Sequence, residues 1–395
     1  MGNRGIYGLM ISGLLLIAAV IYFQSHTEFK KPDEDFQVEL DALVKEYDLP
    51  GATAAYILPN GQSGSASSGF SDVETQTPMS QKSRMLAASI GKSFVAATTI
   101  ALVIEKKLDL DTPFSNWLGK RPWFSRLPNH NDITLRHLLT HSAGLSDHLY
   151  SEKFVQDLAK ARHDLNNTPP PEKLVEYILD QPALFDAGAG WAYTDTGYIL
   201  IGMIIEEVID GTYEEELMAR FINPLGMTST EPSNKIELHS LAAGYTSTDN
   251  HFKLPVKSID ANGKMTWNPA IEWTGGGLIT TPLDLTVWSK SLYDGLAMKG
   301  DYMPMLLQSV PVGGEGSGIR VGLGLAIYEK GPFGKTYGHG GALPGYVSSM
   351  RYYPEHGFGV SFQINTDVGI TDGDPSAVKD MEARLAQIIF NAINQ

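Results

Sequence analysis

The sequence predicts an α+β fold in which one antiparallel sheet is built from both ends of the chain and flanked by helices. Two strands and a hairpin turn are predicted before about residue 70, and after about residue 320 hydrophobic residues alternate with period two, which is typical of half-buried strands. Residues 109–269 instead show helical periods and loops. The most economical fold therefore places the terminal strands in one sheet, covers it with the first and last helices, and inserts a mostly helical domain.

The composition indicates a globular protein with a large core. The chain has 395 residues, of which 43% are hydrophobic and 19% are charged. Its 45 acidic and 30 basic side chains give a net charge of −15, which argues against a nucleic-acid-binding surface. The absence of cysteine excludes disulfides, thiolate nucleophiles and cysteine-ligated zinc.

The amino terminus carries a long apolar segment. Arg4 precedes an uncharged run from Ile6 to Phe23, which as a helix at about 1.5 Å per residue would span roughly 27 Å of hydrocarbon. No clear small-residue cleavage site follows it. We expect residues 1–23 to be an uncleaved membrane anchor, with a cleaved signal peptide as the alternative, and residues 24–35 to be a polar tether. The folded domain would then lie outside the cytoplasm, at the cell envelope, in the periplasm or the extracellular space.

The first part of the folded domain, residues 36–395, begins with a helix and a hairpin. Residues 36–47 have a helical hydrophobic period and end at Leu49-Pro50-Gly51. Residues 52–58 are predicted to be a strand, and Pro59-Asn60-Gly61 the turn into a second strand near residues 65–70. We expect residues 36–108 and 270–395 to form the α/β part of the domain.

The inserted helical part covers residues 109–269. Residues 133–141 are predicted to form a helix that ends at Ser142-Ala143-Gly144, and residues 198–209 a strongly apolar helix. Strands are scarce until residues 275–279. The three glycines there do not suit a phosphate-binding loop, because no helix with a lysine follows in register. They predict a closely packed strand.

The last part of the chain returns to strands. Apolar residues alternate with glycine and other residues over 321–328, and residues 346–353 and 358–364 are predicted to form a hairpin. A final helix places Val378, Met381 and Leu385 on one face. A cleft between the sheet and the helical part is the expected place for a functional site.

The stretch with most chemical content is Ser89-Ile90-Gly91-Lys92, which is followed by an apolar helical run. If a helix begins near Ser89, Lys92 lies on the same face about 5–6 Å away. The hydroxyl would then sit at a helix N-terminus, where N–H groups favour developing negative charge. A lysine able to lose its proton could activate that serine. Taken alone, the pattern more often reflects a capping serine and a solvated lysine.

Other ordered segments accompany this pair. They are Leu49-Pro50-Gly51-Ala52, the stretch from Ile133 to Leu145, Tyr193-Thr194-Asp195, the stretch from Gly275 to Leu285, and Gly338-His339-Gly340-Gly341. Jointly they resemble the serine β-lactamase and penicillin-binding-protein superfamily, in its branch of class C-like β-lactamases, DD-peptidases, D-aminopeptidases and esterases. The resemblance covers roughly residues 36–393 and implies a β-lactamase/transpeptidase-like fold.

The resemblance implies catalytic roles for three residues. Ser89 would be the nucleophile and Lys92 its lysine partner, with Tyr193 acting as general base or sharing that role with Lys92. A phenol beside an ammonium has its ionised form favoured, so it could accept the serine proton. Asp195 stands where this branch usually has asparagine. An ionised carboxylate could pair with Lys92 but cannot donate to a substrate carbonyl, which argues against β-lactam-like or carboxylate-bearing substrates.

The third motif of the resemblance falls at His339-Gly340-Gly341, where β-lactamases have Lys-Thr-Gly. These residues, like Asp195, are expected to contact substrate. A neutral imidazole at His339 attracts a substrate carboxylate less than a lysine would, and the two glycines leave the strand edge open to a substrate backbone. By the family pattern, the N–H groups of Ser89 and Ala342 would form the oxyanion hole.

The leading hypothesis is a serine hydrolase that acts through an acyl-enzyme on a small peptide, amide or ester, without metal or organic cofactor. A D-residue-containing peptide or an ester is favoured over a β-lactam. One alternative is a membrane-tethered penicillin-recognising or sensor protein with little turnover. A further alternative is a zinc hydrolase, because His137 and His141 have the i, i+4 spacing of a metal pair and His148 follows.

Overall fold

The computed structural model describes residues 29, 31–161, 164–314, 316–371 and 373–395. The apolar run Ile6–Phe23, predicted to be a membrane anchor or signal peptide, lies outside the described residues. None of the helices within those residues combines the length and the apolar composition that a bilayer crossing requires.

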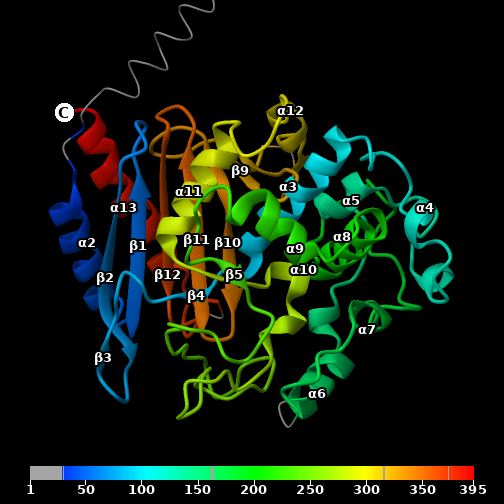
Figure 1. Ribbon diagram of the computed structural model, residues 1–395, viewed down its shortest axis with the longest axis horizontal. Helices are drawn as coiled ribbons and strands as arrows, with labels where there is room; N and C mark the ends of the chain where they lie inside the picture. The colour runs from blue at the N-terminus through cyan, green and yellow to red at the C-terminus, as the bar shows by residue number, and fades with distance from the viewer. Residues whose placement is uncertain (1–28, 30, 162–163, 315, 372) are drawn as a thin grey trace, which may run out of the picture.

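The predicted sheet built from both chain ends is present. Nine strands have the order β3-β2-β1-β12-β11-β10-β9-β8-β7. The N-terminal strand β1 (Gly51–Ile57) lies between β2 (Ser63–Asp72) and the C-terminal strand β12 (Phe358–Ile364), antiparallel to both, with Ala52 opposite Ile364. Figure 1 shows this junction as blue strands beside orange and red ones. The fold class predicted from sequence is therefore confirmed.

The other strands are mostly short. The large sheet also contains β3 (Thr77–Pro78), β7 (Val310–Pro311), β8 (Ile319–Val321), β9 (Ala326–Tyr328), β10 (Thr336–Leu343) and β11 (Tyr346–Tyr353). A second sheet, of order β4-β6-β5, comprises β4 (Met85–Leu86), β5 (Glu231–Pro232) and β6 (Leu278–Thr280).

Helices cover both faces of the large sheet. On one face α2 (Asp33–Glu46) and α13 (Ser376–Ile393) bury Phe36 and Leu385 in one core with Phe362 of β12. On the other face α11 (Pro282–Tyr293) buries Trp288 in a second, larger core. The sheet separates the two cores because successive side chains of a strand point to opposite faces.

The larger core extends into the helical part of the molecule, whose helices lie beside the sheet in Figure 1. The longest helices that contribute to this larger core are α3 (Gly91–Ile104) and α8 (Asp195–Val208). Both are apolar enough to be buried on nearly all sides. Shorter helices are α4 (Ser115–Leu118), α5 (Leu135–Leu139), α6 (Glu152–Ala161), α7 (Pro171–Glu176), α9 (Tyr213–Leu217), α10 (Trp273–Gly276) and α12 (Met303–Leu306). Single turns are η1 (Ala88–Ile90), η2 (Phe124–Arg126), η3 (His148–Tyr150), the π-helical η4 (Met218–Ile222) and η5 (Pro269–Ile271).

Helix α3 is held against the sheet through α11. The Phe94 ring stacks on Trp288 with centroids 4.0 Å apart, and the Trp288 indole Nε1 donates a hydrogen bond to Ser93 Oγ at 2.8 Å. Both rings are fully buried. The helix that follows the predicted nucleophile is thus tied to the sheet one turn after Ser89.

Two expected strands differ in the structure. Residues 273–276 form the single turn of α10, and the strand begins only at Leu278. Residues 321–328 are not one strand: β8 and β9 pair as a hairpin whose turn contains Gly324 at φ +73°. The period-two pattern runs through this turn because Leu323 and Leu325 are both buried in the larger core.

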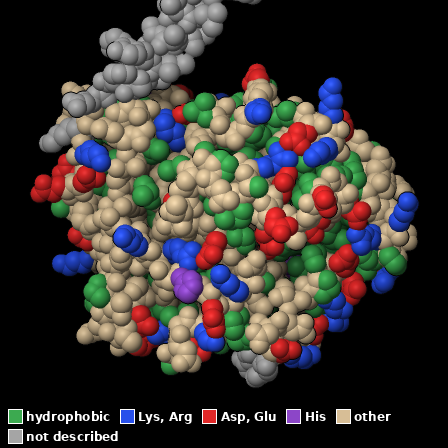
Figure 2. All heavy atoms as spheres, in the orientation of Figure 1, with side chains coloured by type: hydrophobic (Ala, Val, Ile, Leu, Met, Phe, Trp, Pro, Cys, Tyr) green, Lys and Arg blue, Asp and Glu red, His purple; other side chains and the backbone are tan. Residues whose placement is uncertain are grey.

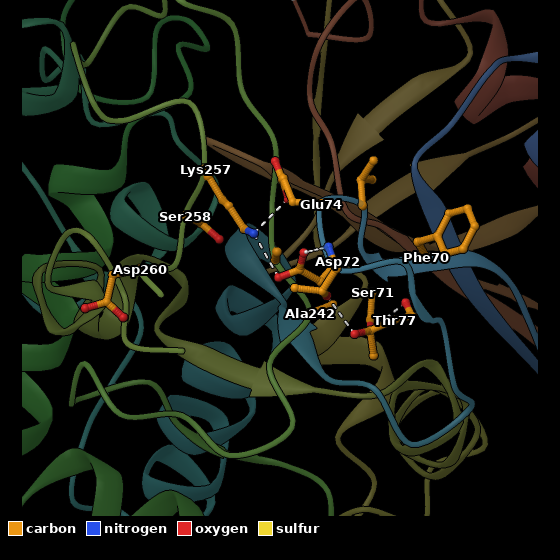
Figure 3. A network of polar contacts seen from close by, with 12 residues as sticks. Phe70, Ser71, Asp72, Glu74, Thr77, Ala242, Lys257, Ser258 and Asp260 are labelled. Carbon is orange, nitrogen blue, oxygen red and sulfur yellow. Dashed lines mark hydrogen bonds and ion pairs between the residues drawn. The ribbon is translucent and has the colours of Figure 1, made fainter. Parts of the chain in front are cut away.

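The surface carries mixed charge. On the face drawn in Figure 2, acidic and basic side chains lie interspersed. Figure 3 shows one polar network, in which Lys257 Nζ contacts Asp72 at 2.8 Å and Glu74 at 2.7 Å. The Tyr245 hydroxyl also donates to Glu74 and accepts the Val73 N–H. These contacts hold the irregular segment 241–260 against the end of β2.

Candidate active site

The predicted nucleophile lies on a tight turn. Ser89 is the middle residue of η1 and is partly exposed, whereas its neighbours are buried. Ala88 has φ +51°, a left-handed conformation that costs energy for a residue with a Cβ. Two glycines pack against this turn. A Cβ at Gly276 would lie 2.4 Å from the Ala88 carbonyl oxygen, and a Cβ at Gly341 would lie 2.3 Å from the Ala87 carbonyl oxygen. Close backbone packing therefore fixes where Ser89 points.

Lys92 is the charged centre of the site. It is fully buried, and its Nζ donates hydrogen bonds to Ser89 Oγ at 3.1 Å and to the Gly275 carbonyl at 2.5 Å. The same atom pairs with Asp195 Oδ1 at 2.5 Å. Burial by itself lowers the pKa of Lys92, but the Asp195 charge and the Tyr193 hydroxyl outweigh it and raise the pKa above its ordinary value. The ammonium form is thus strongly favoured at rest.

Tyr193 comes to the same point from the segment before α8. Its hydroxyl interacts with Ser89 and Lys92, and Lys92 Nζ lies 5.1 Å from the ring centroid. The sequence argument expected the ammonium to favour ionised tyrosine. Lys92 does act in that direction, but burial is the larger effect and raises the pKa of Tyr193 to about 12. The resting phenol is therefore protonated, and Lys92 limits the rise in its pKa.

The start of α8 is bound to the segment before η3. The Asp195 N–H donates to Asp147 Oδ2 at 3.1 Å, and the Leu149 N–H donates to Asp147 Oδ1 at 3.1 Å. Thr194 Oγ1 also donates to the Ser146 carbonyl at 3.0 Å. Asp147 thus caps η3 and also accepts the first N–H of α8.

Three buried carboxyl groups lie around the single lysine. Burial, and next the negative charge of Asp195, raise the pKa of Asp147 to about 7 and that of Glu272 to about 8. Both groups are about nine-tenths buried or more. Among the residues that the structure describes, no group of histidine and carboxylate side chains is arranged to hold a metal ion.

The third motif lies on β10, beside the nucleophile turn. The neighbouring strand β9 pairs with β10 over Thr336–Gly338, so the segment from His339 onward extends past the end of β9. His339 Nδ1 donates to the Gly340 carbonyl at 2.5 Å, and burial lowers the pKa of His339 to about 4. The imidazole is therefore neutral, as expected from its type. Ala342 is exposed on the same segment.

The two histidines with metal-like spacing have separate structural roles. His137 Nδ1 accepts the Thr134 N–H at 3.3 Å, which completes a capping box at the start of α5. His141 Nδ1 accepts the Thr194 N–H at 3.2 Å. His148 Nδ1 lies 3.0 Å from Thr196 Oγ1. Each ring therefore already has a protein partner at Nδ1.

The structure brings together the residues singled out from the sequence. Ser89, Lys92, Tyr193 and Asp195 are in direct contact, and the centroids of the Tyr193 and His339 rings are 6.3 Å apart. Sequence reasoning missed the Gly275 carbonyl, Asp147 and Glu272. For Gly275 the signal was the glycine run itself, which was interpreted as packing alone. No local pattern marked the two carboxylic acids.

The chain is similar in sequence to several known proteins. A sequence model of the Beta-lactamase family matches residues 36–384. Penicillin-binding protein 4* of Bacillus subtilis is 24% identical over 302 residues, which cover 73% of this chain and 62% of that protein. Lovastatin esterase of Penicillium rubens is 31% identical over 176 residues, which cover 44% of this chain and 43% of that protein. The chain thus spans less than two thirds of the length of these two relatives.

Solved structures show the same fold. The D-amino acid amidase from Ochrobactrum anthropi SV3, complexed with L-phenylalanine, superposes with a TM-score of 0.75 at 24% identity, covering 91% of this chain and 98% of that one. The octameric penicillin-binding protein homologue from Pyrococcus abyssi gives a TM-score of 0.70 at 25% identity, covering 89% of this chain and 77% of that one. The likeness therefore extends over nearly all of the described residues.

Proposed function

Because the chain belongs to the Beta-lactamase family, we propose that it hydrolyses an amide or ester through an acyl-enzyme formed on Ser89. The observation that carries this proposal is the contact of Ser89 Oγ with both Lys92 Nζ, at 3.1 Å, and the Tyr193 hydroxyl. A nucleophile within hydrogen-bond reach of its proton acceptor, which is itself held by a third group, is the general signature of covalent catalysis. The relatives named as an esterase and an amidase are consistent with it.

In this mechanism Tyr193 first loses its proton to solvent and is held as a phenolate beside the Lys92 ammonium. Ser89 Oγ then attacks the substrate carbonyl while its proton passes to the Tyr193 oxygen. The N–H groups of Ser89 and Ala342 donate to the oxyanion, each contributing about 3 kcal/mol of transition-state stabilisation. The intermediate expels an amine or alcohol, which takes up the proton from Tyr193. Water then attacks the Ser89 ester by the same route and releases the acid.

The charges in the site favour a substrate without a carboxylate near the scissile bond. His339 is neutral at the position where a lysine would bind such a group, and Lys92 is already paired with Asp195. An ionised Asp195 also repels a second carboxylate and cannot donate to a substrate amide carbonyl. We therefore favour amides or peptides with D-residues, and esters, over penicillins and cephalosporins.

The proposed location is the cell envelope. The support is the uncharged run Ile6–Phe23 in the sequence, together with relatives named as penicillin-binding proteins. Membrane fractionation of cells that express the full chain, followed by a carbonate wash, tests it. Recovery of the chain in the soluble cytoplasmic fraction would contradict this location.

A second candidate is a sensor that is acylated but turns over little. The Asp195–Lys92 ion pair at 2.5 Å favours it, because a lysine kept as an ammonium cannot help to activate the deacylating water. Labelling without product release distinguishes this candidate from the hydrolase.

The test uses the full chain in detergent, as wild type and Ser89→Ala. Each is treated with a fluorophosphonate probe and assayed on a p-nitrophenyl ester, a D-alanine p-nitroanilide and a chromogenic cephalosporin. We expect labelling and turnover by the wild type, with the cephalosporin the poorest substrate, and neither by Ser89→Ala. Turnover that survives the substitution would refute the serine mechanism.

A further inference from the structure

His141 is a buried residue that the proposed mechanism does not use, although it lies against the catalytic tyrosine. The two rings are stacked, with centroids 4.2 Å apart and planes 27° from parallel. The Thr194 N–H donates to His141 Nδ1 at 3.2 Å, and the Ala192 N–H donates to the His141 carbonyl at 3.0 Å. Both neighbours of Tyr193 in the chain are therefore hydrogen-bonded to this one histidine.

The position of the His141 ring is itself fixed by its surroundings. The residue is 1% exposed, and its ring also contacts Tyr198 at a centroid distance of 5.2 Å and Trp191 at 6.4 Å. The Tyr198 hydroxyl donates to the Leu139 carbonyl at 2.8 Å. The imidazole thus has little freedom to move, and it passes this constraint to the Tyr193 ring that stacks on it.

The backbone at His141 is unusual as well. Its φ of +56° places it in the left-handed region immediately after α5, where most residues with a Cβ are strained. This conformation turns the carbonyl of His141 towards Ala192 while its ring faces Thr194 and Tyr193. One residue therefore supplies three constraints on the segment 192–194.

The ring is neutral in this setting. Burial lowers the pKa of His141 well below its ordinary value, and the nearby Lys92 and His339 lower it further. Because Nδ1 accepts the Thr194 N–H, the proton of the neutral ring is on Nε2. A neutral ring stacks on the phenol without adding a second positive charge next to Lys92.

We propose that His141 is a positioning residue for Tyr193, which holds the phenol hydroxyl against Ser89 and Lys92 through its ring and its Nδ1 together. This inference rests on the proposed function, since it needs Tyr193 to accept the Ser89 proton. Misplacing a catalytic group by about 1 Å can lower a rate by about 100-fold. Loss of either constraint should therefore slow the reaction and leave substrate binding nearly unchanged.

Two variants separate the two constraints. His141→Asn keeps a hydrogen-bond acceptor and tolerates a positive φ, but it removes the stacked ring. His141→Phe keeps a ring and removes the acceptor. His137→Asn is the matched control, because it alters a nearby histidine, within α5, whose Nδ1 accepts the Thr134 N–H rather than an N–H of the segment 192–194.

The measurements are the rate of fluorophosphonate labelling, and kcat and KM on the ester substrate, with the full chain in detergent. We expect both His141 variants to lose at least tenfold in labelling rate and in kcat, with KM within about twofold of wild type. The control should stay within twofold in both. A thermal melt of each variant shows whether it folds. If His141→Phe does not fold, His141→Asn alone still tests the proposal.

The decisive comparison repeats both substitutions in a Tyr193→Phe background. Without the hydroxyl there is nothing left to position, so a further loss below twofold supports the proposal. An equal loss in both backgrounds, or wild-type kcat in both single variants, would overturn it. Wild-type activity of Tyr193→Phe would also overturn it. Turnover by Ser89→Ala is a separate result, which would refute the serine mechanism itself.

Discussion

At the scale of single residues, the Asp195–Lys92 pair determines which groups of the site are protonated at rest. Both groups are buried, so neither charge is screened by water, and the Asp195 carboxylate stabilises the ammonium form of Lys92. Lys92 is therefore an ammonium at rest and Tyr193 a neutral phenol. Activity that needs one of these groups deprotonated must rise with pH.

Replacing Asp195 with asparagine tests this assignment. Removing the carboxylate removes a cause that raises the pKa of Lys92, so less alkali is needed to deprotonate the Lys92–Tyr193 pair. We expect the rising limb of kcat/KM against pH to move to lower pH in Asp195→Asn, and activity at pH 7 to increase several-fold. Rates on the p-nitrophenyl ester between pH 6 and 10 measure the shift.

A matched preparation of Ser89→Ala corrects these rates for hydrolysis that does not involve the site. A rising limb that stays at the same pH in Asp195→Asn would show that Asp195 does not set the proton affinity of the pair.

At the scale of elements, the site depends on three backbone segments packed together without intervening side chains. Gly276 at the end of α10 and Gly341 on β10 both contact the turn η1. A methyl group at Gly341 would lie 2.3 Å from the Ala87 carbonyl and 2.6 Å from Ser348 Oγ. The distance from β10 to Ser89 is thus set by the absence of a Cβ at Gly341.

We therefore expect Gly341→Ala to lower kcat at least 100-fold, because β10 must move away from Ser89 and take the Ala342 N–H with it. Overpacking of this kind costs about 1–3 kcal/mol of unfolding free energy. Urea unfolding and ester hydrolysis measure the two effects.

Gly340→Ala is the stability control, since its Cβ would meet its nearest neighbour at 3.8 Å. Its unfolding free energy should equal that of the wild type within about 0.5 kcal/mol. Wild-type kcat in Gly341→Ala would contradict the close approach of β10 to η1.

The network of Figure 3 joins an irregular segment to the sheet. Lys257 lies between Asp72 and Glu74, and its side chain is 27% exposed. Partial exposure screens these pairs, so each contributes about 0.2–1 kcal/mol. We expect Lys257→Met to lower the melting temperature by a few degrees in low salt and by less in 1 M NaCl.

Lys82→Met is the control, because Lys82 is exposed and forms no ion pair with the described residues. Its melting temperature should match that of the wild type at both salt concentrations. An equal loss in the two variants would show that the network does not stabilise the segment 241–260.

How much the sequence could predict follows from how local each signal is. The hairpin 346–364 was predicted residue for residue because its period and its turn are both local. Residues 321–328 were predicted wrongly as one strand, since burial of Leu323 and Leu325 imitates strand alternation across a turn. The division of residues 36–395 into two parts stays a prediction.

The site shows the same limit. Ser89, Lys92, Tyr193 and Asp195 stand in ordered motifs and could be named in advance. Asp147 and Glu272 join them only through tertiary packing, which no spacing along the chain records. The direction of the pKa shift of Tyr193 could not be predicted from the sequence either. Burial raises this pKa and the Lys92 charge lowers it, and burial is known only from the fold.

At the scale of the whole molecule, the buried carboxyl groups make stability depend on pH. The pKa of Glu272 is raised to about 8 in the folded state and returns to its ordinary value on unfolding. Between those values the folded state binds more protons than the unfolded state, so this group makes stability fall as pH rises. The slope is at most about 1.4 kcal/mol per pH unit for each such group.

Glu272→Gln removes this contribution. We expect the difference in unfolding free energy between Glu272→Gln and wild type to shift in favour of the variant as pH rises from 5 to 8.5. Urea unfolding at intervals across that range measures it, and the difference cancels the opposite contributions of the buried histidines. Parallel curves for the two proteins would show that Glu272 is not held protonated by its surroundings.

The pairing of β1 with β12 also has a consequence during synthesis on the ribosome. Ala52 faces Ile364, so β1 of the first hairpin cannot pair with β12 until about 300 further residues have been synthesised. At about 5–20 residues per second, that delay lasts roughly 15 to 60 seconds. Throughout it the nascent chain presents the unpaired edge of β1 to its surroundings, and such edges pair readily with other chains. The helical segments that emerge in between can collapse early, but the sheet closes only when translation is nearly complete.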